Sequence, residues 1–198
     1  MLGKIFRAIF QIISETLELS SLAILFFLAL YIFFVRPHYV DGNSMLPNFH
    51  NNDRLLVEVI GYKLLKREPQ RGDVIVFHPP GQPNLEYIKR IVALPGEKIK
   101  IQNGKIFIIN ERHPEGFLLE EKYLGAGVST ETNERGVIHE GEIFDTGKNY
   151  IVMGDNRSNS YDSRDWGPIQ KEAIVGRAWF RYWPLSDIGF IKTPHYPD

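Results

Sequence analysis

Apolar residues follow two different patterns along the chain. Between Leu17 and Val35 about 19 consecutive residues are almost all apolar, and only Glu18 is charged. A helix needs about 20 such residues to cross the hydrocarbon core of a bilayer. A buried core helix, the alternative, would carry a polar stripe, whereas residues 22–35 offer only the hydroxyl of Tyr31. The pattern therefore predicts a membrane-spanning helix.

This segment differs from a cleavable signal peptide. Such a peptide has an apolar region of about 7 to 15 residues and then small residues at its cleavage site, whereas this segment ends in large side chains and Arg36. We expect the helix to remain as a single-pass anchor. Lys4 and Arg7 precede it, which favours a cytoplasmic N-terminus and an extracytoplasmic domain. A bacterial plasma membrane and a thylakoid-type membrane both fit.

Beyond residue 36 the apolar residues form short alternating runs. Runs rich in valine and isoleucine and bounded by turn residues predict strands, and they occur at 53–60, 73–77, 142–156 and 173–184. The clearest element is a hairpin at 97–111, where Ile99 and Ile101 alternate with polar residues and Asn103-Gly104 supplies a two-residue turn. Residues 111–141 are polar with weak periodicity and predict loops and short irregular strands.

These patterns predict a mostly β fold. Residues 1–36 are expected to form a cytoplasmic N-terminus and transmembrane anchor, and residues 37–198 a domain of antiparallel sheets. A smaller β lobe is expected to be inserted at about 103–148. One N-terminal transmembrane helix would tether the whole domain.

Composition narrows the function classes. The chain has 198 residues, 43% hydrophobic and 24% charged, which leaves room for one globular domain beside the anchor. Its formal net charge of -1 gives no basic excess for a nucleic-acid surface. There is no cysteine, so disulfides, thiolate metal sites and a cysteine nucleophile are excluded.

Ser44 lies in a turn between Gly42 and Pro47, a few residues beyond the apolar segment. A serine in such a place is typical of a turn, and a nucleophilic serine needs a base. The six histidines lie outside any recognisable motif. A Ser-His-Asp triad is therefore unsupported, although not excluded, because triads are defined by geometry.

Lys89 is a second candidate. It stands in the apolar run 86–97, where strand alternation would place it on one face with Tyr87 and Ile91. Loss of solvation on such a face lowers the pKa of a lysine, which could then accept a proton near neutral pH. The alternative is a lysine that extends into solvent from an edge strand.

Residues 154–167 form a loop dense in hydrogen-bonding side chains. As a calcium loop it fails, because Arg157 occupies a ligand position, Arg164 adds positive charge and the central glycine is absent. A loop of this kind could instead orient a buried amine and hold itself in place with an Asp–Arg pair.

Together with the anchor, these stretches resemble the type I signal peptidases, membrane-anchored serine proteases with a Ser-Lys dyad. The resemblance extends over nearly the whole chain, in ordered blocks at 42–47, 71–77, 87–97, 154–167 and 175–185. It implies a serine endopeptidase that removes N-terminal signal peptides from exported preproteins at the outer membrane surface. Its partners would be preprotein signal peptides and membrane lipid, with no nucleic acid, and no metal or organic cofactor would be needed.

The resemblance also implies residue roles. Ser44 would be the nucleophile and Lys89 its general base, which later returns the proton to the leaving amine. Ser160 would orient Lys89. The remaining implied roles are structural: an Asp162–Arg164 pair that holds the loop, Met45 beside the nucleophile, and Gly154, Asp155 and Asn156 in the approach of the loop.

Three positions depart from the family pattern. Gly42 stands where some relatives carry a serine whose hydroxyl joins the oxyanion hole, so the second donor would come from backbone or water. Asn48 replaces the usual threonine, and Glu97 replaces the usual aspartate. The competing hypothesis is a membrane-tethered β-rich binding module or a catalytically inactive relative, and the binding module predicts an exposed Lys89 that titrates normally.

Overall fold

A computed structural model describes residues 2–63, 65, 67–194 and 196 of the chain. The chain divides into two compact units, Met1–Arg36 and Pro37–Asp198. The functions expected of these units, and of the inserted lobe, remain predictions.

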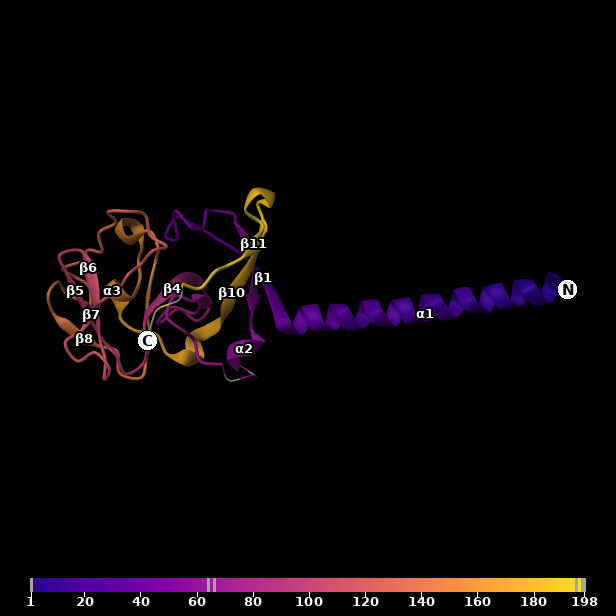
Figure 1. The fold of residues 1–198 in the computed structure, drawn as a ribbon, viewed down its shortest axis with the longest axis horizontal. Helices are drawn as coiled ribbons and strands as arrows, with labels where there is room; N and C mark the ends of the chain where they lie inside the picture. The colour runs from indigo at the N-terminus through magenta and orange to yellow at the C-terminus, as the bar shows by residue number, and fades with distance from the viewer. Residues whose placement is uncertain (1, 64, 66, 195, 197–198) are drawn as a thin grey trace. The chain divides into compact units, whose positions relative to one another are not determined.

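The first unit consists mainly of the helix α1 (Leu2–Phe34), drawn in indigo and violet in Figure 1. Within it, Ile9–Leu28 has a mean hydropathy of 1.5 and is long and apolar enough to cross a membrane, and none of it is buried in the protein. Its length and composition favour the predicted membrane-spanning helix over a buried core helix. The predicted span was Leu17–Val35, but Val35 already begins the first strand.

The larger of two sheets has the strand order β1-β2-β10-β3-β4-β9, and β11 pairs with β10. The pairs from β2 to β9 are antiparallel. The strands are β1 (Val35–Tyr39), β2 (Arg54–Glu58), β3 (Val74–Phe77), β4 (Tyr87–Ala93), β9 (Ile151–Met153), β10 (Ile174–Trp183) and β11 (Gly189–Phe190). The mostly antiparallel β fold predicted from the alternating runs is confirmed.

The second sheet has the order β7-β6-β5-β8, and its labels lie together at one end of the second unit in Figure 1. It contains β5 (Lys98–Gln102), β6 (Lys105–Ile109), β7 (Phe117–Leu118) and β8 (Ile143–Asp145). The hairpin is confirmed, with positive φ angles of 51° at Asn103 and 71° at Gly104. The predicted lobe boundary near residue 103 therefore falls at this turn, inside the sheet.

The remaining elements are short. They are the helices α2 (Ile60–Lys63) and α3 (Ser163–Trp166) and the 3-10 turns Arg157–Asn159, Lys171–Ala173 and Leu185–Asp187. The predicted run 142–156 divides between the two sheets, as β8 in one and β9 in the other. The loop 154–167 therefore follows directly from a strand that pairs with β4.

Strand β4 is enclosed on both faces. It lies between β3 and β9, and every residue from Ile88 to Ala93 is buried. Ile88 packs in a cluster with Val74, whereas Ile91 packs with Phe77 on the other side of the sheet. A polar side chain on this strand is thus removed from solvent whichever face it occupies.

Candidate active site

Ser44 and Lys89 meet in the structure, although 45 positions separate them in sequence. The Lys89 Nζ donates a hydrogen bond of 2.7 Å to the Ser44 Oγ and one of 3.0 Å to the Ile88 carbonyl. The five described histidines make no hydrogen bond to Ser44, and His195 lies outside the described residues. The amine of Lys89 is therefore the basic group that contacts this hydroxyl.

The surroundings of Lys89 shift its protonation equilibrium toward the neutral form. The side chain is 5% exposed, on a strand in the interior of the sheet. Burial lowers its pKa from 10.5 to about 8, and this effect outweighs the carboxylates of Asp162 and Asp155, which raise the pKa. The Nζ lies 5.5 Å from the centre of the Tyr87 ring, consistent with the predicted shared face. The alternative of a lysine extending into solvent from an edge strand is wrong.

The turn that carries Ser44 is anchored in the core. Met45 is fully buried and packs with Phe49 in a core cluster that includes residues of β2 and β3. Gly42 has a φ of 94°, which favours glycine, and its amide donates to the Asn51 Oδ1 at 2.9 Å. That amide is already engaged and does not serve as a second oxyanion donor in this arrangement.

The loop that follows β9 packs directly on the Ser44 turn. The backbone amide of Asn156 donates to the Ser44 carbonyl at 2.9 Å, and its side-chain amide donates to the Asn43 carbonyl at 3.0 Å. Gly154 approaches so closely that a Cβ there would lie 2.3 Å from the Ser44 carbonyl oxygen and 2.2 Å from the Ser160 Oγ. This contact has room only for glycine.

Asp162 and Arg164 form a buried bidentate ion pair. The Arg164 Nε and Nη2 each lie 2.9 Å from a different oxygen of the Asp162 carboxylate. Asp162 also caps α3 and accepts a hydrogen bond from the Gly154 amide at 3.0 Å. The pair therefore connects the far side of the loop to the glycine that touches the Ser44 turn.

The side-chain hydroxyl of Ser160 lies beside the same contact. Its Oγ is buried and has no partner among the described residues, and Lys89 donates to Ser44 and Ile88 instead. Orientation of Lys89 by Ser160 stays a prediction.

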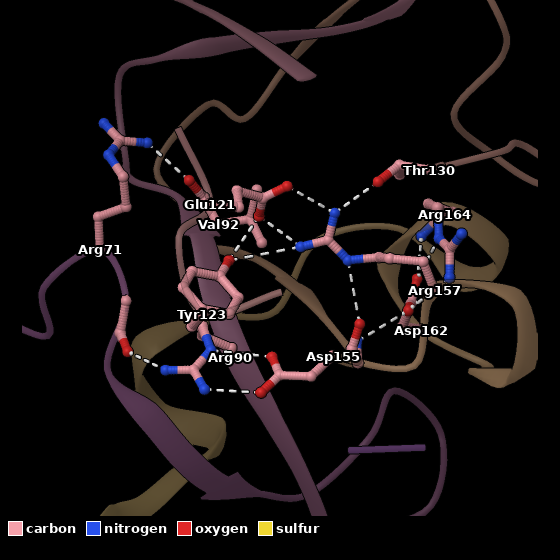
Figure 2. A network of polar contacts seen from close by, with 12 residues as sticks. Arg71, Arg90, Val92, Glu121, Tyr123, Thr130, Asp155, Arg157, Asp162 and Arg164 are labelled. Carbon is pink, nitrogen blue, oxygen red and sulfur yellow. Dashed lines mark hydrogen bonds and ion pairs between the residues drawn. The ribbon is translucent and has the colours of Figure 1, made fainter. Parts of the chain in front are cut away.

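Sequence reasoning missed the polar network around the loop, which is drawn in Figure 2. Arg90 forms a bidentate pair with Asp155, at 2.8 and 2.6 Å, and Arg157 bonds to Glu121 and Thr130. The one available signal was Arg90 itself, a second cation in an apolar run whose two faces are both buried. The loop that holds Glu121 has no periodicity that could have indicated its partner.

Ser44 and Lys89 line a cavity of about 770 Å³. Its walls come from residues before Ser44, from the approach to β4, and from Asn159 and Tyr161. Among the described residues no group of three or more histidine, aspartate or glutamate side chains is placed to hold a metal ion. What the site offers is a hydroxyl in contact with an amine that sheds its proton readily, which is the requirement for activating an oxygen nucleophile.

The chain is similar to known proteins of one family. A family model described as Signal peptidase, peptidase S26 matches residues 13–183. Signal peptidase I of Leptolyngbya laminosa is 34% identical over 187 residues, which cover 91% of this chain and 84% of that protein. Signal peptidase IB of Staphylococcus aureus strain MRSA252 is 33% identical over 189 residues, covering 91% of this chain and 96% of that protein.

A crystal structure of a signal peptidase I from Enterococcus faecalis V583 aligns with a TM-score of 0.43 at 27% identity, covering 56% of this chain and 97% of that chain. The apolar helix and the curated relatives together indicate a membrane-anchored enzyme. Because the family model spans most of the sequence, the chain belongs to the signal peptidase family, peptidase S26.

Proposed function

We propose that this enzyme is a serine endopeptidase that cleaves signal peptides from exported preproteins with a Ser44–Lys89 dyad. The observation that carries the proposal is the 2.7 Å hydrogen bond between the Ser44 Oγ and a buried Lys89 amine of lowered pKa. The binding-module hypothesis required an exposed, normally titrating Lys89. The burial of this side chain argues against it.

The reaction follows from this contact. Neutral Lys89 takes the hydroxyl proton as the Ser44 Oγ attacks the scissile carbonyl carbon, and the resulting ammonium gives that proton to the leaving amine as the peptide bond breaks. Water then attacks the acyl-enzyme ester, its proton passing to Lys89. Collapse of this second tetrahedral intermediate releases the signal peptide with a new C-terminal carboxylate, and Lys89 returns the proton to the Ser44 Oγ.

The anchor has a physical role in this proposal. A signal peptide is held in the bilayer by its own apolar segment. An enzyme anchored in the same membrane meets its substrate at a raised effective concentration without any additional contact. We place the catalytic domain on the extracytoplasmic side of a single membrane span, where preproteins emerge.

Cleavage of a detergent-solubilised preprotein by the full chain tests the proposal. Ser44→Ala and Lys89→Ala should each lower kcat by at least about 1000-fold, because members of a catalytic unit fail together. Matched controls are Ser186→Ala, at an exposed serine, and Lys98→Ala, at an exposed strand lysine; both should cleave normally. Cleavage at the wild-type rate by either site variant, with folding intact, would refute the dyad.

A further inference from the structure

Asn48 connects the Ser44 turn to two other parts of the chain. Its Nδ2 donates to the Tyr123 carbonyl and to the Asp155 Oδ2, both at 2.9 Å. Its own carbonyl accepts a hydrogen bond of 2.8 Å from the Arg181 Nη2. A residue four positions after Ser44 is thereby held from three sides.

One of the two acceptors, the Asp155 carboxylate, is fixed to the strand of Lys89. Asp155 is 1% exposed and pairs with Arg90, which is 3% exposed and follows Lys89 in β4. Figure 2 shows both Arg90–Asp155 contacts. The side chain of Asn48 therefore bonds to a carboxylate that is immobilised by the residue next to Lys89.

The residue of the other acceptor, Tyr123, contacts the same strand through its ring. The Arg90 guanidinium lies 4.0 Å from the centre of the Tyr123 ring, close enough for a cation–π contact. Two residues before Tyr123, Glu121 forms an ion pair with the buried Arg157 of the loop, as Figure 2 also shows. Neither partner of Asn48 can move without disturbing Arg90 or the loop.

An amide suits this position because its nitrogen carries two donors. Asn48 can satisfy two acceptors at once, whereas threonine, the residue expected here from the family pattern, has one hydroxyl proton to donate. Asn48 is not among the residues that line the cavity with Ser44 and Lys89. Its hydrogen bonds therefore affect where the turn lies relative to β4, and its side chain does not line the cavity.

We propose that Asn48 is a positioning residue for catalysis, which holds the Ser44 turn in register with β4 so that the Ser44 hydroxyl meets the Lys89 amine. The inference rests on the proposed function. A 2.7 Å contact between groups on two separate segments survives only if the segments are joined nearby. A misplacement of about 1 Å can lower a rate about 100-fold.

The test is steady-state cleavage of a preprotein by Asn48→Leu and Asn48→Thr in the full chain. Loss of alignment should lower kcat for Asn48→Leu by about 10- to 100-fold and leave KM within about twofold. Asn48→Thr retains one donor and should recover part of the loss.

Asn110→Leu is the matched control. The Asn110 Nδ2 donates to the Glu97 Oε1 at 3.2 Å, beside the buried Arg71–Glu97 pair. Asn110 lines a different cavity from the one that Ser44 and Lys89 line. It should lower the thermal midpoint of unfolding about as much as Asn48→Leu while keeping kcat.

An unchanged kcat in Asn48→Leu would overturn the inference, and so would an equal loss of kcat in Asn110→Leu, which would indicate general destabilisation. The dyad is judged separately. If Ser44→Ala still cleaves, the proposed function fails whatever Asn48 does. If Ser44→Ala is inactive and Asn48→Leu has full kcat, only the positioning role fails.

Discussion

The pH dependence of cleavage reports directly on Lys89. An amine must be neutral to accept the Ser44 proton, and burial lowers the Lys89 pKa from 10.5 to about 8. At pH 7 a lysine of ordinary pKa is neutral in about 0.03% of molecules, whereas one with a pKa near 8 is neutral in about 9%. The buried site therefore raises the reactive fraction about 300-fold at this pH, or about 3 kcal/mol.

The assay is hydrolysis of a fluorogenic peptide that spans a signal-peptide cleavage site and lacks groups titrating between pH 6 and 10. Below pH 8 the value of kcat/KM, which reports the free enzyme, should rise about tenfold per pH unit and then level off above about pH 9. The direction follows from the base: lower pH protonates Lys89 and removes the acceptor.

Lys89→Arg separates proton transfer from charge. A guanidinium stays protonated throughout this pH range, so the variant should be inactive at every pH. A midpoint near pH 10, a flat profile between pH 6 and 9, or an active Lys89→Arg variant would each refute the assignment of Lys89 as the base.

Two further substitutions probe the loop after β9. Gly154→Ala would place a Cβ 2.3 Å from the Ser44 carbonyl oxygen, so kcat should fall more than about tenfold in the same assay. Gly189→Ala, a control with open space around the new Cβ, should leave kcat unchanged. Equal kcat values in the two variants would contradict the close approach. Asp162→Ala leaves the buried Arg164 without its carboxylate partner and should lower the free energy of unfolding in urea by about 3 to 5 kcal/mol. Turnover per folded molecule should change less than stability does. A stable variant without turnover would contradict this.

Local pattern predicted much of the fold. Alternation located most strands, and Asn103-Gly104 fixed the hairpin because its turn needs two positive φ angles. Alternation also placed Lys89 on the face of Tyr87, where the structure has it. Strand β1 was missed because Val35 continues the apolar run of the helix, so the sequence has no visible break there.

The polar partners could not be predicted, because their pairing is set by tertiary structure. Asn48 and Tyr123 are 75 positions apart, and Arg90 and Asp155 are 65 apart. Nothing in the composition of either segment specifies the other. The resemblance marked Asp155 for the approach of the loop, but it gave no reason to connect that carboxylate with Asn48.

The network also explains how two carboxylates can lie near a base that must lose its charge. Asp155 and Asp162 both raise the pKa of Lys89, which opposes the loss of the amine proton. Each carboxylate, however, is bound in bidentate fashion by its own arginine, Arg90 or Arg164. An arginine beside each carboxylate offsets part of its negative charge, and burial remains the larger influence on the Lys89 pKa. The loop can therefore brace the Ser44 turn while the pKa of Lys89 stays below its ordinary value.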